Sequence, residues 1–240
     1  MTANADVQSA NTVGFNTINI EGGKWYMVAP QFEDVANAGG ETIDLLKTMT
    51  FEGFKAVTYA NRLSGSKISI YNSSTGLYTT YYYVSGTGGI GWRQTPAAPS
   101  TLPVKVGTGV WMWVHEAEDG AKITVAGQVK AADDFSVNVG NDGEWKIVSN
   151  PYPTDLTIGN LTTTDLAAVT YANRLNGSQI SVYNSATGLY NTFYYVNGTG
   201  GVQWRASPPM PAASTVICPI GKGFWVKAAS AGTLKFSLNK

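Results

Sequence analysis

The chain has one cysteine and one histidine among its 240 residues, Cys218 and His115. A single cysteine excludes a disulfide within the chain, and with a single histidine it leaves too few ligands for a Cys/His metal site. Charge is also scarce: charged residues make up 13% of the chain, and 16 basic residues balance 16 acidic ones. Nucleic acids and acidic membrane surfaces are bound through clustered positive charge, so we expect neither as a partner.

Long apolar runs are missing too. None approaches the roughly 20 residues that a membrane helix needs, so we expect no membrane insertion. Met1–Val13 is small and polar and does not read as a signal peptide. It resembles a start methionine placed before a mature N terminus from which the signal has been removed, which predicts an extracellular or cell-surface protein. Hydrophobic residues reach 43%, which argues against a disordered chain.

The sequence contains a long internal duplication. Val57–Arg93 and Val169–Arg205 are identical at 28 of 37 positions without a gap, and they start 112 residues apart. A period of that length is typical of a duplicated domain rather than of a solenoid repeat. We therefore expect a flexible N-terminal arm over residues 1–12, a first domain over 13–129 and a second domain over 133–240.

Alternating apolar and polar residues indicate strands. The alternating run Val13–Ile20 is followed by Gly22-Gly23 and then by Trp25–Val28, a pattern that predicts a hairpin. The second copy repeats the design with Phe135–Val139, an Asn-Asp-Gly turn and Trp145–Val148. Further strands are expected at Lys67–Tyr71, Leu77–Val84, Gly109–Val114, Ile123–Val125, Gly223–Lys227 and Leu234–Leu238.

One helix is expected, over Thr42–Met49, with a threonine cap and Asp44 in its first turn. The other expected elements are short, regularly spaced strands separated by turns. The predicted fold class is all-β, with two tandem, internally duplicated antiparallel β-sandwich domains.

Two motifs of the second copy resemble β modules of secreted proteins from Bacteroidetes and related bacteria. Trp145–Pro153 (WKIVSNPYP) resembles their W-N-L-V-G-N-P-Y-P element, and the run from Ile220 (IGKGFWVKA) resembles P-G-Q-G-F-F-V-K-A. The first copy matches less closely, with Ala29–Phe32 (APQF) in place of the Asn-Pro-Tyr-Pro element. The resemblance implies secretion and a surface or matrix setting, and its motifs carry no catalytic residue.

Candidate catalytic residues are few. His115 has an alanine near its place in the second copy, so a histidine-based site would exist in one copy only. Paired aspartates, Asp34 and Asp44 with Asp155 and Asp165, could serve a glycosidase, but aspartates after turns and at helix starts more often cap backbone N–H groups. We expect no catalytic residue, no metal and no cofactor, although calcium bound by oxygen ligands alone stays open.

Aromatic residues form the most informative set. Six of seven tryptophans pair between the copies: Trp25 with Trp145, Trp92 with Trp204, and Trp111 with Trp225. Trp113 has Lys227 as its counterpart. Because Trp111 and Trp113 share one face of a strand, that face is a candidate for glycan or protein contact, unless Trp113 is buried against the second domain. Tyr81 and Tyr83 form a second candidate face, whereas Trp92 and Trp204 are expected in the core.

These features predict a non-enzymatic, secreted structural protein, a self-assembling subunit of an extracellular fibre or surface layer that forms homo-oligomers or filaments. An N-terminal arm could add a strand to the sheet edge of a neighbour. The alternative is a carbohydrate-binding or adhesive module using Trp111, Trp113, Tyr81 and Tyr83, and a third hypothesis is a hydrolase using the paired aspartates. The assembly arm comprises Thr2, Ala3, Asn4, Ala5, Asp6, Val7 and Gln8.

Overall fold

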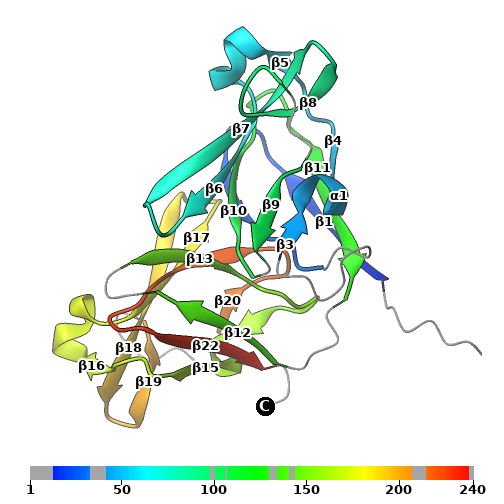
Figure 1. The fold of residues 1–240 in the computed structure, drawn as a ribbon. Coiled ribbons are helices and arrows are strands. Elements are labelled where there is room, and N and C mark those ends of the chain that lie inside the picture. Colours follow the sequence, from blue (N-terminus) through cyan, green and yellow to red (C-terminus); the bar gives the residue numbers. More distant parts are fainter. Residues whose placement is uncertain are drawn as a thin grey trace, which may run out of the picture.

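A computed structural model describes residues 13–32, 42–97, 101–105, 107–129, 134–140, 144–206 and 215–237. The arm over residues 1–12, including Thr2–Gln8, lies outside these described residues, as does Asp34. Within them the chain is all-β, as predicted: it forms 22 strands, one short α-helix and short 3-10 helices. Figure 1 shows the strands up to β11 in the upper part of the molecule and the strands from β12 onward in the lower part.

The first half builds two main sheets. One has three antiparallel strands in the order β1-β11-β4, and the other has the order β2-β10-β6-β7-β5, with β8 also paired to β7. A separate pair joins β3 and β9. The bounds are β1 (Val13–Ile20), β2 (Trp25–Val28), β3 (Thr42–Asp44), β4 (Met49–Glu52), β5 (Val57–Thr58), β6 (Lys67–Asn72), β7 (Leu77–Gly86), β8 (Gly89–Arg93), β9 (Pro103–Lys105), β10 (Val110–Trp113) and β11 (Ala121–Gln128).

The second half builds the same sheets in the same order. They are β12-β22-β15, then β13-β21-β17-β18-β16 with β19 paired to β18, and the pair β14-β20. The bounds are β12 (Asp134–Val139), β13 (Trp145–Ser149), β14 (Leu156–Thr157), β15 (Leu161–Thr164), β16 (Val169–Thr170), β17 (Gln179–Asn184), β18 (Leu189–Gly198), β19 (Gly201–Arg205), β20 (Val216–Cys218), β21 (Gly223–Lys227) and β22 (Gly232–Ser237).

The duplicated segments keep one register. Lys67 of β6 faces Tyr82 of β7, and Gln179 of β17 faces Tyr194 of β18, at equivalent positions of the two copies. Since a slip of one residue would turn every side chain of a strand to the other face, equal registers put equivalent residues on equivalent faces.

The expected hairpin between β1 and β2 does not form. β1 pairs with β11 and β2 pairs with β10, so the turn at Gly22-Gly23 carries the chain from one sheet to the other. The second half does the same, because β12 pairs with β22 and β13 pairs with β21. Burial explains the difference: Ile20 on β1 and Val28 on β2 are 1% and 0% exposed and enter the same core from different sheets. A flat hairpin could not bring both apolar faces into one core.

The expected helix at Thr42–Met49 is mostly strand. Thr42–Asp44 forms β3, and only Leu45–Thr48 forms the helix α1. Its cap is Asp44, whose Oδ1 accepts a hydrogen bond from the Leu46 N–H at 3.1 Å, so the predicted threonine cap is wrong. Apolar Ile43 and Leu45 are both buried, and the pairing of β3 with β9 satisfies the backbone before the helical turn begins.

Two parallel pairs interrupt the expected antiparallel pattern. β5 runs parallel to β7, and β16 runs parallel to β18. After each of these short strands the chain turns through a 3-10 helix, η2 (Tyr59–Ser64) or η4 (Tyr171–Asn176), before it enters the next strand. The 3-10 helix reverses the chain. The two strands that follow it, β6 and β7 or β17 and β18, form an antiparallel hairpin, and the short strand before it pairs with the second strand of that hairpin.

Each half has a buried apolar cluster of its own. One draws on residues from Ile18 to Val125 and the other on residues from Val139 to Phe236. Trp92 and Trp204 are 3% and 5% exposed and belong one to each cluster, which confirms that they are core residues. A third, smaller cluster contains Met27, Trp111 and Ile147 and therefore joins the two halves.

Candidate functional site: an aromatic cleft between the halves

The two halves meet through reciprocal contacts. The Ala29 N–H after β2 donates to the Gly221 carbonyl before β21 at 2.9 Å, and the Ser149 N–H at the end of β13 donates to the Gly107 carbonyl before β10 at 2.8 Å. Ala29 and Ser149 are equivalent residues of the two copies, and so are Gly221 and Gly107. The two hydrogen bonds are therefore the same contact with the halves exchanged. Such an exchange is the mark of an approximate two-fold relation, as in an isologous dimer interface.

Glycines allow this close approach. A Cβ atom on Gly109 would lie 2.9 Å from Cγ2 of Ile147 in the other half, and one on Gly223 would lie 3.2 Å from Sδ of Met27. Met27 and Ile147 occupy equivalent positions on β2 and β13 and are both buried. The packing between the halves is therefore reciprocal at the level of side chains as well.

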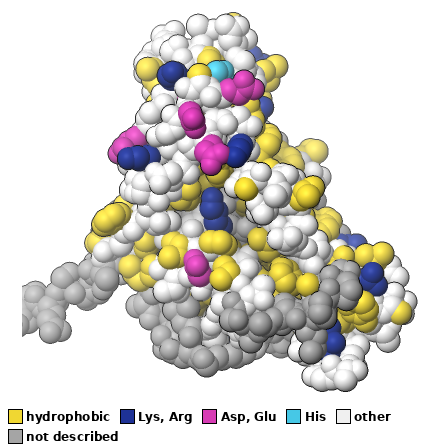
Figure 2. All heavy atoms as spheres, turned by 180° about the vertical axis from the view of Figure 1, so that it is seen from behind, with side chains coloured by type: hydrophobic (Ala, Val, Ile, Leu, Met, Phe, Trp, Pro, Cys, Tyr) yellow, Lys and Arg dark blue, Asp and Glu magenta, His cyan; other side chains and the backbone are white. Residues whose placement is uncertain are grey.

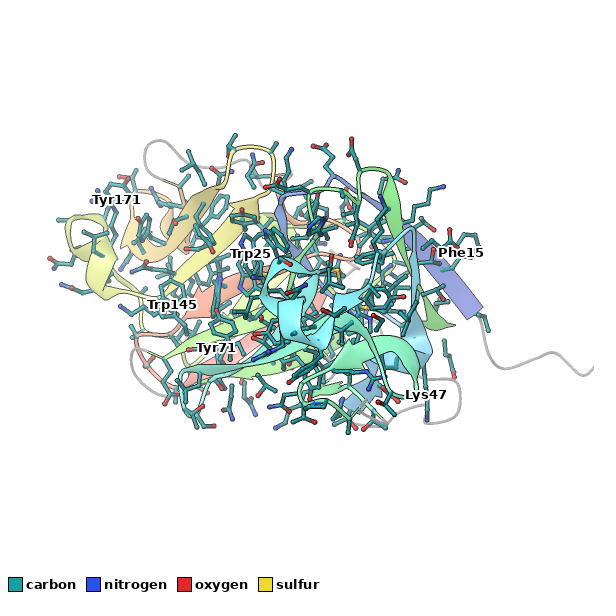
Figure 3. The ribbon with its side chains drawn as sticks, turned by 90° about the horizontal axis from the view of Figure 1, so that it is seen from above. Phe15, Trp25, Lys47, Tyr71, Trp145 and Tyr171 are labelled. Atoms are coloured by element: carbon teal, nitrogen blue, oxygen red, sulfur yellow. The ribbon has the colours of Figure 1, made fainter. Side chains whose placement is uncertain are left out.

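Aromatic rings extend the same pattern. Tyr71 of β6 meets Trp225 of β21 with ring centroids 4.9 Å apart and planes at 77°, and Tyr183 of β17 meets Trp111 of β10 with the same distance and angle. Trp25 and Trp145 then stand edge-on to Trp111 and Trp225, at 5.9 and 6.1 Å. In Figure 3 the labelled Trp25, Tyr71 and Trp145 all lie in the region where strands of the two halves come together.

Strand alternation puts these side chains on one face. On β10, Met112 enters the core while Trp111 points the other way, and on β6 Ile68 enters the core while Ser69 points the other way. Cross-strand pairing places Ser69 opposite Thr80, and their hydroxyls lie 2.9 Å apart. The equivalent pair in the second half, Ser181 and Thr192, lies 3.0 Å apart.

The side chains on this face line an open cleft with a volume of about 430 Å³. Both halves contribute to it, and every lining side chain is a tryptophan, a tyrosine or a small hydroxyl residue. The lining residues are Trp25, Ser69, Tyr78, Thr80, Trp111, Tyr183, Tyr190 and Trp225. The lining thus offers ring faces and neutral hydroxyl groups without a formal charge.

Each half contributes one partly exposed tyrosine to the cleft, Tyr78 and Tyr190. Tyr78 and Tyr190 are each 47% exposed. Burial raises the pKa of Tyr78, and the neighbouring Tyr190 and Tyr71 raise it further. Burial also raises the pKa of Tyr190, while a hydrogen bond with Trp225 acts in the opposite direction. Both phenols therefore stay neutral hydrogen-bonding groups at physiological pH.

Of the aromatic residues predicted to make contacts, some line the cleft and others pack into the core. Trp111 lines the cleft. Tyr81 and Tyr83 lie on the opposite face of β7 and pack against the core of the first half, so they do not reach the cleft; Tyr78 takes the place that was expected of them. Alternation along β7 puts Tyr78 on one face of the strand and Tyr81 and Tyr83 on the other, but it does not show which face is buried.

Trp113 lies outside the cleft lining. Its ring is half-buried under the Lys67 ammonium group, 4.9 Å from Nζ, and stands 6.2 Å from the His115 ring. Lys67 also lies over Trp25, at 5.5 Å. The contacts of Trp113 to Lys67 and His115 are all within the first half.

The other candidates have structural partners. The His115 Nδ1 accepts a hydrogen bond from the Ala117 N–H at 3.0 Å, and buried Ser66 donates to Glu118 rather than to the imidazole, so no serine–histidine pair forms there. His115 is the single cyan side chain at the surface in Figure 2. Asp44 accepts a hydrogen bond from the Leu102 N–H and Asp155 accepts one from the Ile220 N–H, both at 2.9 Å. These two aspartates therefore bind backbone N–H groups, as expected for capping residues.

The four arginines occupy matched positions in the two copies, Arg62 with Arg174 and Arg93 with Arg205, and their side chains hold loops. Arg93 is buried and donates to the carbonyls of Thr87 and Gly89, and Arg205 donates to the carbonyl of Thr199. Arg62 and Arg174 each stack over a tyrosine, Tyr59 and Tyr171, with the guanidinium carbon 4.7 Å from the ring centroid. Their matched positions in the two copies therefore reflect matched loops.

Two other kinds of site are absent from the described residues. No three His, Cys, Asp or Glu side chains gather as a metal site in the described part of the chain. Within the same ranges no helix is long and apolar enough to span a bilayer.

The comparisons give no family for the chain: no protein-family model matches it, and no curated protein matches it either.

Proposed function

We propose that the chain is a secreted, non-enzymatic carbohydrate-binding protein, built from two copies of one β-sandwich unit, and that the cleft between the copies holds the glycan. The observation that carries this proposal is the lining of the cleft, which combines six tryptophan and tyrosine rings with the hydroxyl groups of Ser69 and Thr80. Sugar rings present C–H groups on their faces and hydroxyls at their edges, so they need aromatic platforms and neutral hydrogen-bonding partners together.

The openness of the site supports a sugar over a small apolar ligand. Tyr78 and Tyr190 keep nearly half of their surface in contact with solvent. A wholly apolar ligand would gain most from a closed, dry pocket, whereas a glycan leaves its outer hydroxyls in water. Secretion is proposed from the resemblance to secreted bacterial β modules.

The test is binding of the full chain to an array of neutral and charged glycans, followed by calorimetry on the best ligand. Tyr78→Ala and Tyr190→Ala are the preferred variants, because both side chains are exposed enough to be removed with little effect on folding. Each should weaken binding about tenfold, the effect of losing one good aromatic contact. Trp113→Ala, on the same strand as Trp111 but outside the cleft, is the matched control. Retention of no glycan would overturn the proposal.

A second candidate function is self-assembly into a fibre or surface layer. Among the described strands, β1 lies at the edge of its three-stranded sheet and pairs with β11 alone. It carries no charged residue, and its Val13 and Phe15 are 64% and 78% exposed. Soluble proteins usually protect such edges with charge or proline, so an uncharged edge favours pairing with another chain. In Figure 3 Phe15 lies far from the labelled residues of the cleft, so the two functions would use separate surfaces.

On the face that Figure 2 shows, charged side chains are few among many neutral and hydrophobic ones. Self-assembly through β1 is tested by deleting Thr2–Thr12 and, separately, by the substitution Phe15→Lys. Both changes should reduce assembly seen by light scattering and electron microscopy. A parent chain that stays monomeric at high concentration would remove this candidate and leave glycan binding unaffected.

A further inference from the structure

We infer that the glycan is acidic, and that the ammonium group of Lys67 binds the carboxylate or sulfate of the sugar unit that lies against Trp25. This inference rests on the proposed function and specifies the chemical class of its ligand. It follows from the unequal shares of the two halves in the cleft, from the position of Lys67 beside the lining, and from the lack of an acidic partner for this lysine among the described residues.

The cleft lies more on the first half than on the second. Five lining residues come from the first half and three from the second: Trp25, Ser69, Tyr78, Thr80 and Trp111, and then Tyr183, Tyr190 and Trp225. The five belong to the adjacent strands β2, β10, β6 and β7 of one sheet. A ligand in the cleft would therefore rest mainly on this sheet of the first half.

Lys67 lies on the same face of that sheet, next to the lining. On β6 it is two residues from Ser69, and side chains two apart along a strand point to the same face. It pairs with Trp113 of β10 on one side and with Tyr82 of β7 on the other. Its Nζ atom stands 5.5 Å from the centroid of the Trp25 ring and 4.9 Å from that of Trp113. Lys67 thus brings a positive charge to a ring that lines the cleft.

No acidic side chain in the described part of the chain neutralises this charge. The ion pair found there joins Lys24 and Glu21. The buried carboxylate of Glu118 accepts hydrogen bonds from the Ser66 hydroxyl at 2.6 Å and from a backbone N–H at 3.0 Å, and it forms no ion pair with Lys67. Aromatic rings attract an ammonium group but accept no strong hydrogen bond from it, whereas an anion would accept a charge-assisted one. Lys67 can therefore bind an anion without losing an existing ion pair.

The second half lacks this arrangement. The equivalent of Lys67 is the neutral Gln179, and Lys227 takes the place of Trp113. Lys227 pairs with Trp145, which does not line the cleft. The hairpins of the two copies keep the same register with lysine at one position and glutamine at the other, so the sheet itself does not require the lysine. Its charge is available to a ligand at the first-half end of the cleft.

The experiment compares oligosaccharides that differ only in charge. The glycan array should carry each acidic oligosaccharide beside its uncharged form, including an oligogalacturonate beside its methyl ester and a sulfated galactan oligomer beside the desulfated one. Calorimetry on the full chain then measures both members of the best pair. We expect the acidic member to bind about tenfold more tightly, the effect of one charge-assisted hydrogen bond, and added salt to reduce this preference. The pair that shows the preference identifies the anionic group as a carboxylate or a sulfate.

Three variants test the part played by Lys67. Lys67→Gln introduces the residue that the second copy has at this position, and it should remove the preference while leaving the affinity for the uncharged form unchanged. Lys67→Arg should keep the preference, because the positive charge stays. Lys227→Gln is the matched control: it removes a lysine beside Trp145, outside the cleft lining, and should change neither affinity. Circular dichroism verifies the folded state of each variant.

The outcomes separate this inference from the proposed function. Uncharged forms that bind as tightly as their acidic partners in every pair would overturn the inference while glycan binding itself stands. An unchanged preference in Lys67→Gln, or an equal loss of preference in Lys227→Gln, would also overturn it, because the preference would then arise from another residue or from the net charge of the chain. Retention of no glycan, acidic or uncharged, would overturn both.

Discussion

Tyr71 of β6 packs edge-on against Trp225 of β21, with ring centroids 4.9 Å apart, although the two residues belong to different halves of the chain. The exchanged pair, Tyr183 with Trp111, repeats the distance and the angle. Contacts that repeat in this way stabilise one arrangement of the halves, because both pairs are lost together if the halves separate or rotate. Trp225, Tyr183 and Trp111 of these pairs also line the cleft, so the packing of the halves and the proposed binding share these three residues.

Gly109 is predicted to be essential for this packing. Gly109→Val should lower the free energy of unfolding by about 1–3 kcal/mol, the usual cost of overpacking, because a Cβ atom there would lie 2.9 Å from Ile147. Urea denaturation measures the change. The control is Gly91→Gln: a Cβ atom at Gly91 meets nothing within 4 Å, and the second half has Gln203 at that position. Equal effects of the two substitutions would contradict the role assigned to Gly109.

Trp204 is predicted to contribute to stability rather than to binding. It is 5% exposed and stacks with Tyr195 at a centroid distance of 5.1 Å. Trp204→Ala should cost about 3–5 kcal/mol, as for other large buried aromatic residues. Thermal unfolding followed by circular dichroism provides the measurement, with Trp113→Ala as a half-buried comparison. Near-normal melting of the Trp204 variant would show that the side chain is not packed as described.

Asp165 is predicted to be strained. It is the only non-glycine residue with a positive φ (64°) in the described ranges, and Gly53 (φ 77°) follows the equivalent strand of the first half. Asp165→Gly should raise the free energy of unfolding by about 0.5 kcal/mol, since glycine relieves the left-handed strain but adds entropy to the unfolded chain. Asp155→Gly should instead destabilise, because Asp155 accepts the Ile220 N–H. A destabilising effect of Asp165→Gly, measured in urea, would argue against strain.

Stability is predicted to fall at high pH. Burial raises the pKa values of Tyr78 and Tyr190 above the ordinary value of 10.0. A raised pKa in the folded state means that the folded chain holds these protons more tightly, so the resulting stability is complete below pH 10 and is lost as the pH rises through the folded-state values. Urea midpoints measured between pH 8 and pH 11 test this.

The double variant with Tyr78→Phe and Tyr190→Phe is the control for that experiment. It should lose less stability over the same pH range, while Tyr26 and Tyr83, whose pKa values burial also raises, keep part of the effect. An identical pH profile for the parent and the double variant would exclude a contribution from the two cleft tyrosines.

Much of the local structure could be predicted from the sequence. The alternation in Val13–Ile20 and the repeated segment beginning at Val57 predict strands that the structure contains, and the pairing of Trp92 with Trp204 correctly indicated core positions. These features depend on neighbours along the strand or on burial common to both copies, so a one-dimensional pattern carries them.

The choice of partner strands could not be predicted in the same way. The turn at Gly22-Gly23 is compatible with a hairpin and with a crossing between sheets, and only the burial of Ile20 and Val28 in one core favours the crossing. Likewise, alternation along β7 separates Tyr81 and Tyr83 from Tyr78 but does not identify the inner face.

The cleft depends on tertiary structure more than any other feature. Trp111 stood out in the sequence because it recurs as Trp225, but its contact with Tyr183 joins residues 72 positions apart and requires both halves to be folded and docked. Composition and periodicity record what each strand buries, because burial follows the strand's own period. They do not record which surfaces meet, because that depends on glycine-permitted close approach at Gly109 and Gly223 and on side chains contributed by distant strands.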